Sequence, residues 1–158
     1  MNTAYVALGA NLGDPRATVL AAFAALANLP ESRVARCSSL YRTAPVGILD
    51  QPDFVNAVAV LETSLTADAL LDALLDTEAR FGRIRRERNG PRTLDLDLLL
   101  YDDIELDLPH LTLPHPRLHL RAFVLLPLAE VAPGLAIPRR GSLAAWLPAV
   151  ANQCIVRL

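Results

Sequence analysis

The sequence predicts an α+β fold: a ferredoxin-like βαββαβ sandwich, with a mostly antiparallel sheet, helices and extra C-terminal elements. Three observations support this prediction. Strand-like and helix-like segments follow one another in that order, turn residues separate them, and a length of 158 residues suits one domain. We therefore expect residues 1–158 to form a single domain.

The first half of the sequence predicts the βαββ part of this order. The expected elements are a strand at 3–9, a helix that begins at 15 and ends near 28–30, and strands at 33–42 and 53–63. Asp14 followed by Pro15 is typical of an N-cap and a first helical position. The connection 43–52 is long for a hairpin, which is a reason to suspect that it has a function.

The second half predicts a helix, a strand and C-terminal additions. The expected elements are a helix at 66–81 that ends at Gly82, a strand at 93–101, a short helix at 118–128 and another helix at 142–150. A second long loop, 82–91, precedes the strand. Alternation assigns the strand residues to two faces: Leu94, Leu96, Leu98 and Leu100 on one, and Asp95, Asp97, Leu99 and Tyr101 on the other.

The composition excludes several chemistries. All fifteen basic residues are Arg, so the lysine of a P-loop or of a Schiff-base enzyme is missing. Genome composition alone also explains such a bias. A net charge of −2 argues against a nucleic-acid or membrane-surface partner. No apolar run approaches the ~20 residues of a membrane span, and no signal peptide is visible. We therefore expect a cytoplasmic protein.

Charge is unevenly distributed along the chain. Six arginines fall between positions 80 and 92, and six acidic residues without an intervening base follow between 95 and 107. Guanidinium groups bind phosphate oxygens in a bidentate manner. A solvated charged loop is the usual outcome for such a run, but Glu87 is the only acidic residue within it, so an external anion is the simpler explanation. The pattern favours a site for a polyanion and its cations.

Asp95 and Asp97 are candidate metal ligands. At positions i and i+2 of a strand, their carboxylates leave the same face, with Cα atoms about 6.5–7 Å apart. Mg²⁺ takes one or two carboxylates and completes its shell with water and substrate phosphates. A polar outer strand face gives the same alternation, so both interpretations stay open for this pair alone.

Two further polar residues stand out. Asn56 lies in the middle of an apolar strand, where its amide either ties a loop or recognises the edge of a heterocycle. His115 lies between Pro114 and Pro116, in a rigid segment that suits a hydrogen-bond donor. A non-catalytic ligand-binding or RNA-binding module is the alternative. RNA readers of this class carry aromatic clusters on their central strands, whereas aromatic residues make up only 5% of this chain.

Several segments resemble one enzyme family. They are Gly90–Asp97 (GPRTLDLD), Ala7–Gly13 (ALGANLG), Ser39–Thr43 (SLYRT), Gln51–Asn56 (QPDFVN) and Leu113–Pro116 (LPHP). Together they resemble 6-hydroxymethyl-7,8-dihydropterin pyrophosphokinase, and the likeness extends from residue 5 to about 135. The resemblance implies a single pyrophosphokinase domain, expected to be monomeric, that transfers pyrophosphate from ATP to the hydroxymethyl group of 6-hydroxymethyl-7,8-dihydropterin, giving AMP in folate biosynthesis.

The resemblance also implies roles for individual residues. Two Mg²⁺ ions would bind Asp95 and Asp97, which with Arg83 and Arg92 form the catalytic set. The implied ATP-binding residues are Glu78, Arg85, Arg92, Leu98, Thr112, His115 and Arg121. The implied pterin-binding residues are Thr43, Pro45, Val46, Phe54, Asn56, Asp95 and Phe123. Three positions depart from the family pattern: Asn89, His110 and Pro116.

Overall fold

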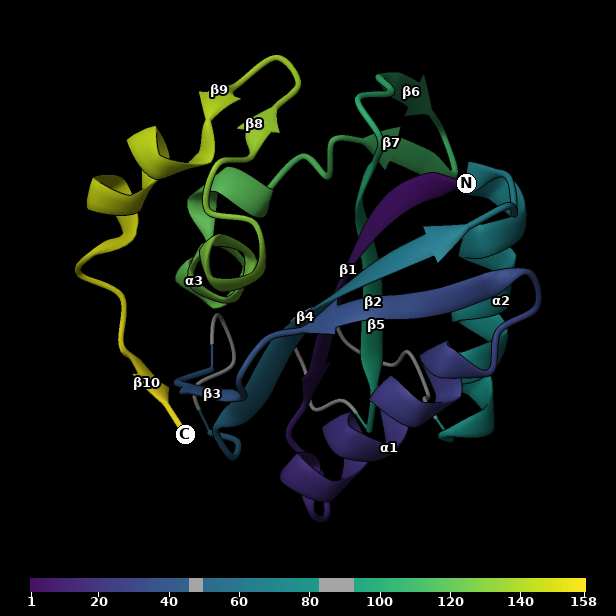
Figure 1. The fold of residues 1–158 in the computed structure, drawn as a ribbon. Helices are drawn as coiled ribbons and strands as arrows, with labels where there is room; N and C mark the ends of the chain where they lie inside the picture. Colours follow the sequence, from purple (N-terminus) through teal and green to yellow (C-terminus); the bar gives the residue numbers. More distant parts are fainter. Residues whose placement is uncertain (46–49, 83–92) are drawn as a thin grey trace.

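The computed structural model describes residues 1–45, 50–82 and 93–158, and it confirms the predicted βαββαβ order (Figure 1). The elements of this part are β1 (Asn2–Ala10), α1 (Pro15–Ala27), β2 (Ser32–Cys37), β3 (Tyr41–Thr43), β4 (Phe54–Thr63), α2 (Ala67–Arg80) and β5 (Asp95–Tyr101). All strand pairs of the main sheet are antiparallel. The order is β10-β3-β4-β1-β5, and β2 also pairs with β4.

The C-terminal elements are short and follow β5. They are β6 (Leu106–Leu108), β7 (Leu111–Leu113), η1 (Leu118–Leu120), α3 (Ala122–Val131), β8 (Ala136–Ile137), β9 (Gly141–Ser142), η2 (Leu143–Val150) and β10 (Ile155–Arg157). Strand β10 returns to the main sheet and pairs with β3. Within the described ranges, no helix combines the length and apolar character that crossing a membrane requires.

Two apolar layers lie on opposite faces of the sheet. Helices α1 and α2 cover one face, where Leu96 and Leu98 of β5 belong to the same buried cluster as Leu26 and Leu74. Helix α3 and η2 cover the other face, and Figure 1 shows α3 apart from α1 and α2, across the sheet. Helix α3 and η2 therefore form a third layer that the βαββαβ order alone does not include, whereas β7 packs on the α1–α2 side and β10 joins the main sheet.

Local signals explain the ends of the two first helices. The Asp14 carboxylate accepts a hydrogen bond from the Ala17 backbone N–H at 3.1 Å, and Pro15 occupies the first turn. Thr66 caps α2 in the same way, accepting from the Ala69 N–H at 3.1 Å. Both caps satisfy backbone donors that lack an intrahelical partner, so both helix starts agree with the sequence prediction.

The predicted single strand at 33–42 is wrong. It is divided into β2 and β3, and the break falls at 38–40. Ser38 binds Val58 twice at the break: its backbone N–H donates to the Val58 carbonyl, and its hydroxyl accepts from the Val58 N–H, both at 2.9 Å. The Ser39 N–H donates to the Glu130 carboxylate instead of a strand neighbour. These side-chain bonds compete with the sheet ladder and end it.

The two predicted C-terminal helices also differ from the structure. The expected helix 118–128 is the 3₁₀ turn η1 followed by α3, with Arg121 between them in an extended conformation (φ −122°, ψ 117°). The expected helix 142–150 is a 3₁₀ helix, η2, that contains Pro148. Proline lacks the N–H that an α-helical bond would need at that position.

A bulge in β5 corrects two face assignments. Tyr5 of β1 pairs with Leu100 while Val6 pairs with Leu98, so Leu99 is an extra residue. One extra residue reverses the alternation beyond it. Leu100 therefore lies in the cluster on the α3 side, and Tyr101 lies on the α1–α2 side, opposite to the sequence prediction.

Candidate active site

A row of three residues crosses the sheet on the face that α3 covers. Gly9 of β1 pairs with Asp95 of β5 on one side and with Asn56 of β4 on the other. Directly paired residues of adjacent strands present their side chains on the same face. In the next row on this face Asp97 pairs with Ala7, which belongs to the α3-side cluster. Both carboxylates thus face α3, as the alternation predicts.

Asn56 is held in one orientation at the end of this row. The side chain is 5% exposed, and its Nδ2 donates to the Thr43 hydroxyl at 2.7 Å. Gly9 has no side chain to separate Asn56 from Asp95, and a Cβ at this position would lie only 2.9 Å from the Asn56 Oδ1. We call this row, which has an amide at one end, a carboxylate at the other and no side chain between them, the glycine floor.

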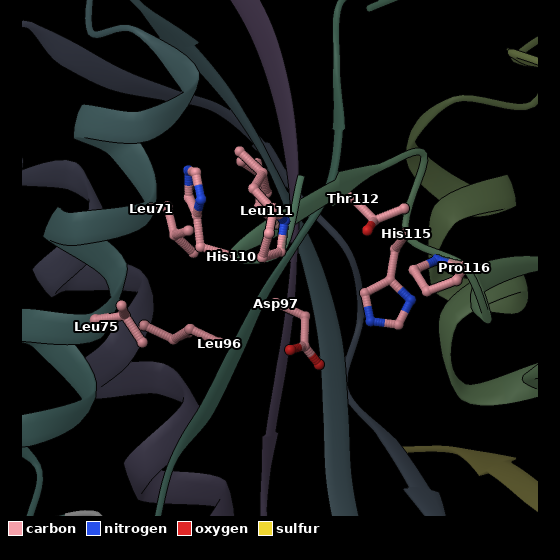
Figure 2. Close-up of a pocket in the computed structure, with 11 residues that line it drawn as sticks. Leu71, Leu75, Leu96, Asp97, His110, Leu111, Thr112, His115 and Pro116 are labelled. Atoms are coloured by element: carbon pink, nitrogen blue, oxygen red, sulfur yellow. The ribbon is translucent and has the colours of Figure 1, made fainter. Parts of the chain in front are cut away.

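A cleft of about 310 Å³ runs along β5, the edge strand of the sheet (Figure 2). Its walls come from α2, β5, the β6–β7 hairpin and the segment that follows it. The lining residues are Leu71, Leu75, Leu96, Asp97, Leu98, Pro109, His110, Leu111, Thr112, His115 and Pro116. Four residues for which the resemblance implies a role, Asp97, Leu98, Thr112 and His115, therefore meet in one cleft.

His115 is fixed by backbone contacts on both sides. Its N–H donates to the Leu99 carbonyl at 2.9 Å, and its ring Nδ1 accepts from the Arg117 N–H at 3.1 Å. The ring proton of the neutral form must then be on Nε2. Burial, and then the positive charge of Arg121, lower the pKa of His115 to about 4, although Asp95 acts in the opposite direction. At neutral pH His115 is an uncharged donor.

The shifted pKa of His115 makes stability depend on pH. A neutral histidine favoured by the fold means that the unfolded chain binds more protons between pH 6.5 and about 4. The free energy of unfolding should therefore fall as pH drops through this window. We expect His115→Gln to reduce the loss between pH 6.5 and 5 by about 1–2 kcal/mol, as measured by urea titration at both values. An unchanged loss would contradict this environment for the ring.

Arg121 and Phe123 lie at the start of α3. The Arg121 guanidinium carbon is 5.3 Å from the centroid of the Phe123 ring, within the range of a cation–π contact. The positive charge of Arg121 also lowers the pKa of His115, so Arg121 interacts electrostatically with the His115 ring. Asp95 of β5 and Arg121, which directly precedes α3, thus both act on the pKa of His115.

Glu78 supports the strand that carries the two aspartates. Its carboxylate is buried, with the residue 2% exposed, and accepts a hydrogen bond from the Leu96 N–H at 2.7 Å. Leu96 lies between Asp95 and Asp97, so this bond fixes the backbone that presents both carboxylates. The bond places the buried Glu78 carboxylate at the edge of β5 that does not pair with β1, and the ATP contact implied by the resemblance stays a prediction.

The remaining predicted residues are divided between described and undescribed parts. Phe54 precedes Asn56 by two positions on β4 and pairs with Thr43, and Pro45 follows shortly after Thr43. Val46, Arg83, Arg85 and Arg92 lie outside the described residues. The sequence analysis assigned Gly9 no role in the site, although Gly9 ends the strand expected at 3–9. A glycine at the end of an alternating strand is the signal that a close approach is needed there.

The carboxylate pair fits a magnesium site better than an all-protein metal cage. Across residues 1–45, 50–82 and 93–158, no group of three or more His, Cys, Asp or Glu side chains is placed to hold a metal ion. Two carboxylates on one face of β5, of which Asp97 lines the cleft, match the preference of Mg²⁺, which draws its other ligands from water and phosphate oxygens.

A family model decides the class of this protein. The model described as 7,8-dihydro-6-hydroxymethylpterin-pyrophosphokinase (HPPK) matches residues 5–133. The chain belongs to the HPPK family. It is therefore an enzyme, a diphosphotransferase of folate biosynthesis, as the sequence resemblance predicted, and the alternative of a non-catalytic module is wrong.

Relatives cover almost the whole chain. The 2-amino-4-hydroxy-6-hydroxymethyldihydropteridine pyrophosphokinase of Pseudomonas aeruginosa is 50% identical over 98% of this chain and 95% of its own. The Haemophilus influenzae protein of the same name is 42% identical over 100% of this chain and 99% of its own.

Solved structures support the HPPK fold. A Plasmodium falciparum HPPK-DHPS structure with pteroate superposes with a TM-score of 0.75 and 14% identity. Wild-type HPPK-DHPS with SDX-DHP gives a TM-score of 0.71 and 16% identity. In the latter comparison the matched region covers 94% of this chain and 43% of the longer HPPK-DHPS chain. At such identities the likeness concerns the ferredoxin-like α+β fold.

Proposed function

We propose that this HPPK-family enzyme transfers the pyrophosphoryl group of ATP to the hydroxymethyl oxygen of 6-hydroxymethyl-7,8-dihydropterin, with two Mg²⁺ ions, and releases AMP. The observation that carries the proposal is the position of Asp95 and Asp97. Asp95 ends the row that contains Asn56, while Asp97 lines the edge cleft. One carboxylate therefore belongs to each of two adjoining regions that suit two substrates.

The row on the sheet suits a flat heterocycle. An amide with both a donor and an acceptor matches the amide-like edge of a pterin, and Asn56 is held by Thr43 at one end of the glycine floor. Phe54 and Phe123 supply aromatic faces, the second next to Arg121. A pterin read by Asn56, Thr43 and Pro45 would direct its hydroxymethyl group toward Asp95.

The edge cleft suits a nucleotide. The Leu96 N–H points away from β1, toward Glu78, and alternate residues of an antiparallel strand direct their N–H and C=O groups to the same edge. The N–H and C=O of Leu98 therefore point toward the cleft that this residue lines, where they offer a donor and an acceptor to a purine edge. Thr112 and His115 lie farther along the same wall.

The reaction requires neutralised charge rather than a protein nucleophile. The pterin hydroxyl oxygen attacks the β-phosphorus, the bond from that phosphorus to the α,β-bridging oxygen breaks, and AMP leaves with that oxygen. The hydroxyl proton is released to water. Asp95 and Asp97 would hold the Mg²⁺ ions, whose charge would neutralise the phosphates and align their oxygens. The His115 Nε2–H and the Arg121 guanidinium supply fixed positive potential next to the phosphates. Arg83 and Arg92 contribute further charge in this proposal.

The nature of the nucleotide product tests the proposal. With ATP, Mg²⁺ and 6-hydroxymethyl-7,8-dihydropterin, we expect one AMP per pterin diphosphate, measured by chromatography, and no product after chelation of the metal. The matched control omits the pterin and should show no AMP. Formation of ADP instead would show transfer of a single phosphoryl group and would refute the proposal.

The proposal also includes the cellular location and the oligomeric state of the protein. A cytoplasmic monomer that binds neither nucleic acid nor membranes stays the prediction of the sequence. Light scattering after size exclusion, with and without both substrates, tests the monomer directly: a mass near 17.1 kDa is expected, and twice that mass would contradict it.

A further inference from the structure

Gln153, in the C-terminal segment, binds the backbone on both sides of Arg121. Its Oε1 accepts from the Ala122 N–H at 2.9 Å, and its Nε2 donates to the Leu120 carbonyl at 2.9 Å. Those two groups belong to the two peptide bonds that flank Arg121. The Gln153 side-chain amide therefore makes two hydrogen bonds around Arg121, which lies 32 positions earlier in the sequence.

This contact fixes the backbone torsions of Arg121. The two peptide planes that flank a residue are related to each other by its φ and ψ alone. Arg121 adopts φ −122° and ψ 117°, close to the values of a parallel strand. The Gln153 amide pairs with the flanking carbonyl and N–H as a neighbouring strand would, so it holds Arg121 extended at the break between η1 and α3.

The backbone that carries the Gln153 side chain is itself restrained. Its backbone N–H donates to the Val150 carbonyl at 3.1 Å, and Val150 is 4% exposed in the cluster beneath α3. The Ala122 N–H is one of the first backbone donors of α3, which have no partner inside the helix, and the structure gives α3 no side-chain cap from Arg121. Gln153 supplies that missing acceptor from a distant segment.

We propose that Gln153 is a positioning residue that sets the direction of the Arg121 side chain and, through it, the placement of positive charge in the active site. The proposal rests on the function proposed above for Arg121. The Cα–Cβ direction of Arg121 follows from the two torsions that Gln153 restrains. The guanidinium then reaches its place over Phe123.

A double-mutant cycle with Arg121 tests the proposal. We expect Gln153→Ala to lower kcat about tenfold, since a misplaced charge loses transition-state stabilisation, with the KM for the pterin within about twofold of the original value. In an Arg121→Ala background, Gln153→Ala should cost less than about twofold more, because both changes remove the same interaction. Additive losses would overturn the proposal.

A second variant and a second measurement separate this role from a general loss of structure. Gln153→Glu keeps the length of the side chain and an acceptor for the Ala122 N–H, but its carboxylate cannot donate to the Leu120 carbonyl. Its loss of kcat should be smaller than that of Gln153→Ala. Asn152→Ala, at the adjacent exposed amide, is the control and should behave as the unmodified enzyme.

Amide hydrogen exchange at Ala122 reports on the contact without any catalysis. Gln153→Ala should accelerate exchange at this amide while the thermal midpoint stays within a few degrees. If exchange accelerates and Arg121→Ala is impaired but Gln153→Ala keeps full kcat, the positioning role is wrong. If Arg121→Ala itself keeps full kcat, the proposed catalytic charge of Arg121 fails, and the exchange result shows separately whether the contact exists. Unchanged exchange overturns the contact itself.

Discussion

Replacing Asp97 by alanine should lower kcat by about a hundredfold to a thousandfold without unfolding the enzyme. Asp97 lines the edge cleft on the side of His115, and with Asp95 it forms the carboxylate pair that we propose for Mg²⁺. Its loss leaves a single carboxylate for the ions. The neighbouring Leu96 and Leu98 stay packed against α1 and α2 on the opposite face, so the strand keeps its hydrophobic anchors.

Three measurements separate a catalytic loss from a structural one. Steady-state kcat at saturating substrates gives the size of the effect, and circular dichroism gives the thermal midpoint. A non-hydrolysable ATP analogue should stabilise the original protein only when Mg²⁺ is present, and this stabilisation should shrink in Asp97→Ala. Asp103→Ala removes an exposed carboxylate beyond the end of the same strand and should keep full activity. Near-normal Mg²⁺-dependent turnover in Asp97→Ala would remove the metal assignment.

The placement of the two aspartates was predictable because it depends on local geometry. Alternation along a strand sets the face of each side chain. Leu94, Leu96 and Leu98 are buried in the core on one face, so Asp95 and Asp97 lie on the other. The same rule fails two residues later, since the bulge at Leu99 reverses Leu100 and Tyr101. A bulge arises from pairing with β1, and nothing in the composition of β5 signals it.

The floor of the site was not predictable because it depends on register between distant strands. Gly9, Asn56 and Asp95 are far apart in the sequence, and only the pairing of β1 with both β4 and β5 joins them in one row. Asn56 alone left two interpretations open, a loop tie or a heterocycle contact. The structure shows the tie, to Thr43, and the pterin contact stays a proposal that the row supports.

The break at Arg121 illustrates a third kind of limit. Its sequence context is helical in composition, and the sequence predicted a continuous helix over 118–128. The extended conformation of Arg121 requires a partner for the Leu120 carbonyl and the Ala122 N–H, and Gln153 supplies both from the C-terminal segment. Long-range polar contacts of this kind override local helix propensity.

Gly9→Ala should raise the KM for the pterin about 10- to 100-fold, the equivalent of about 1–3 kcal/mol of overpacking, while affinity for an ATP analogue stays within about twofold. The added Cβ would lie 2.9 Å from the Asn56 Oδ1. Asn56 cannot yield easily, because it is 5% exposed and its Nδ2 is bound to Thr43 at 2.7 Å. Either the amide turns away from its orientation or the strands shift, and both change the proposed pterin floor.

Gly134→Ala is the matched control, because a Cβ there meets nothing within 4 Å; it should leave both KM values and the thermal midpoint unchanged. The steric origin is tested by adding Gly9→Ala to Asn56→Ala, in which the opposing Oδ1 is gone. Gly9→Ala alone should lower the thermal midpoint because of this clash. In the Asn56→Ala background it should lower the midpoint little, although pterin binding remains weak because the amide is missing. If Gly9→Ala destabilises the Asn56→Ala variant as much as the original protein, the clash is not with Asn56. An unchanged pterin KM in Gly9→Ala alone would show that the row across β5, β1 and β4 does not hold the pterin. The cross-strand row is thus testable apart from the metal pair: Asp97→Ala acts on turnover, and Gly9→Ala acts on recognition of one substrate.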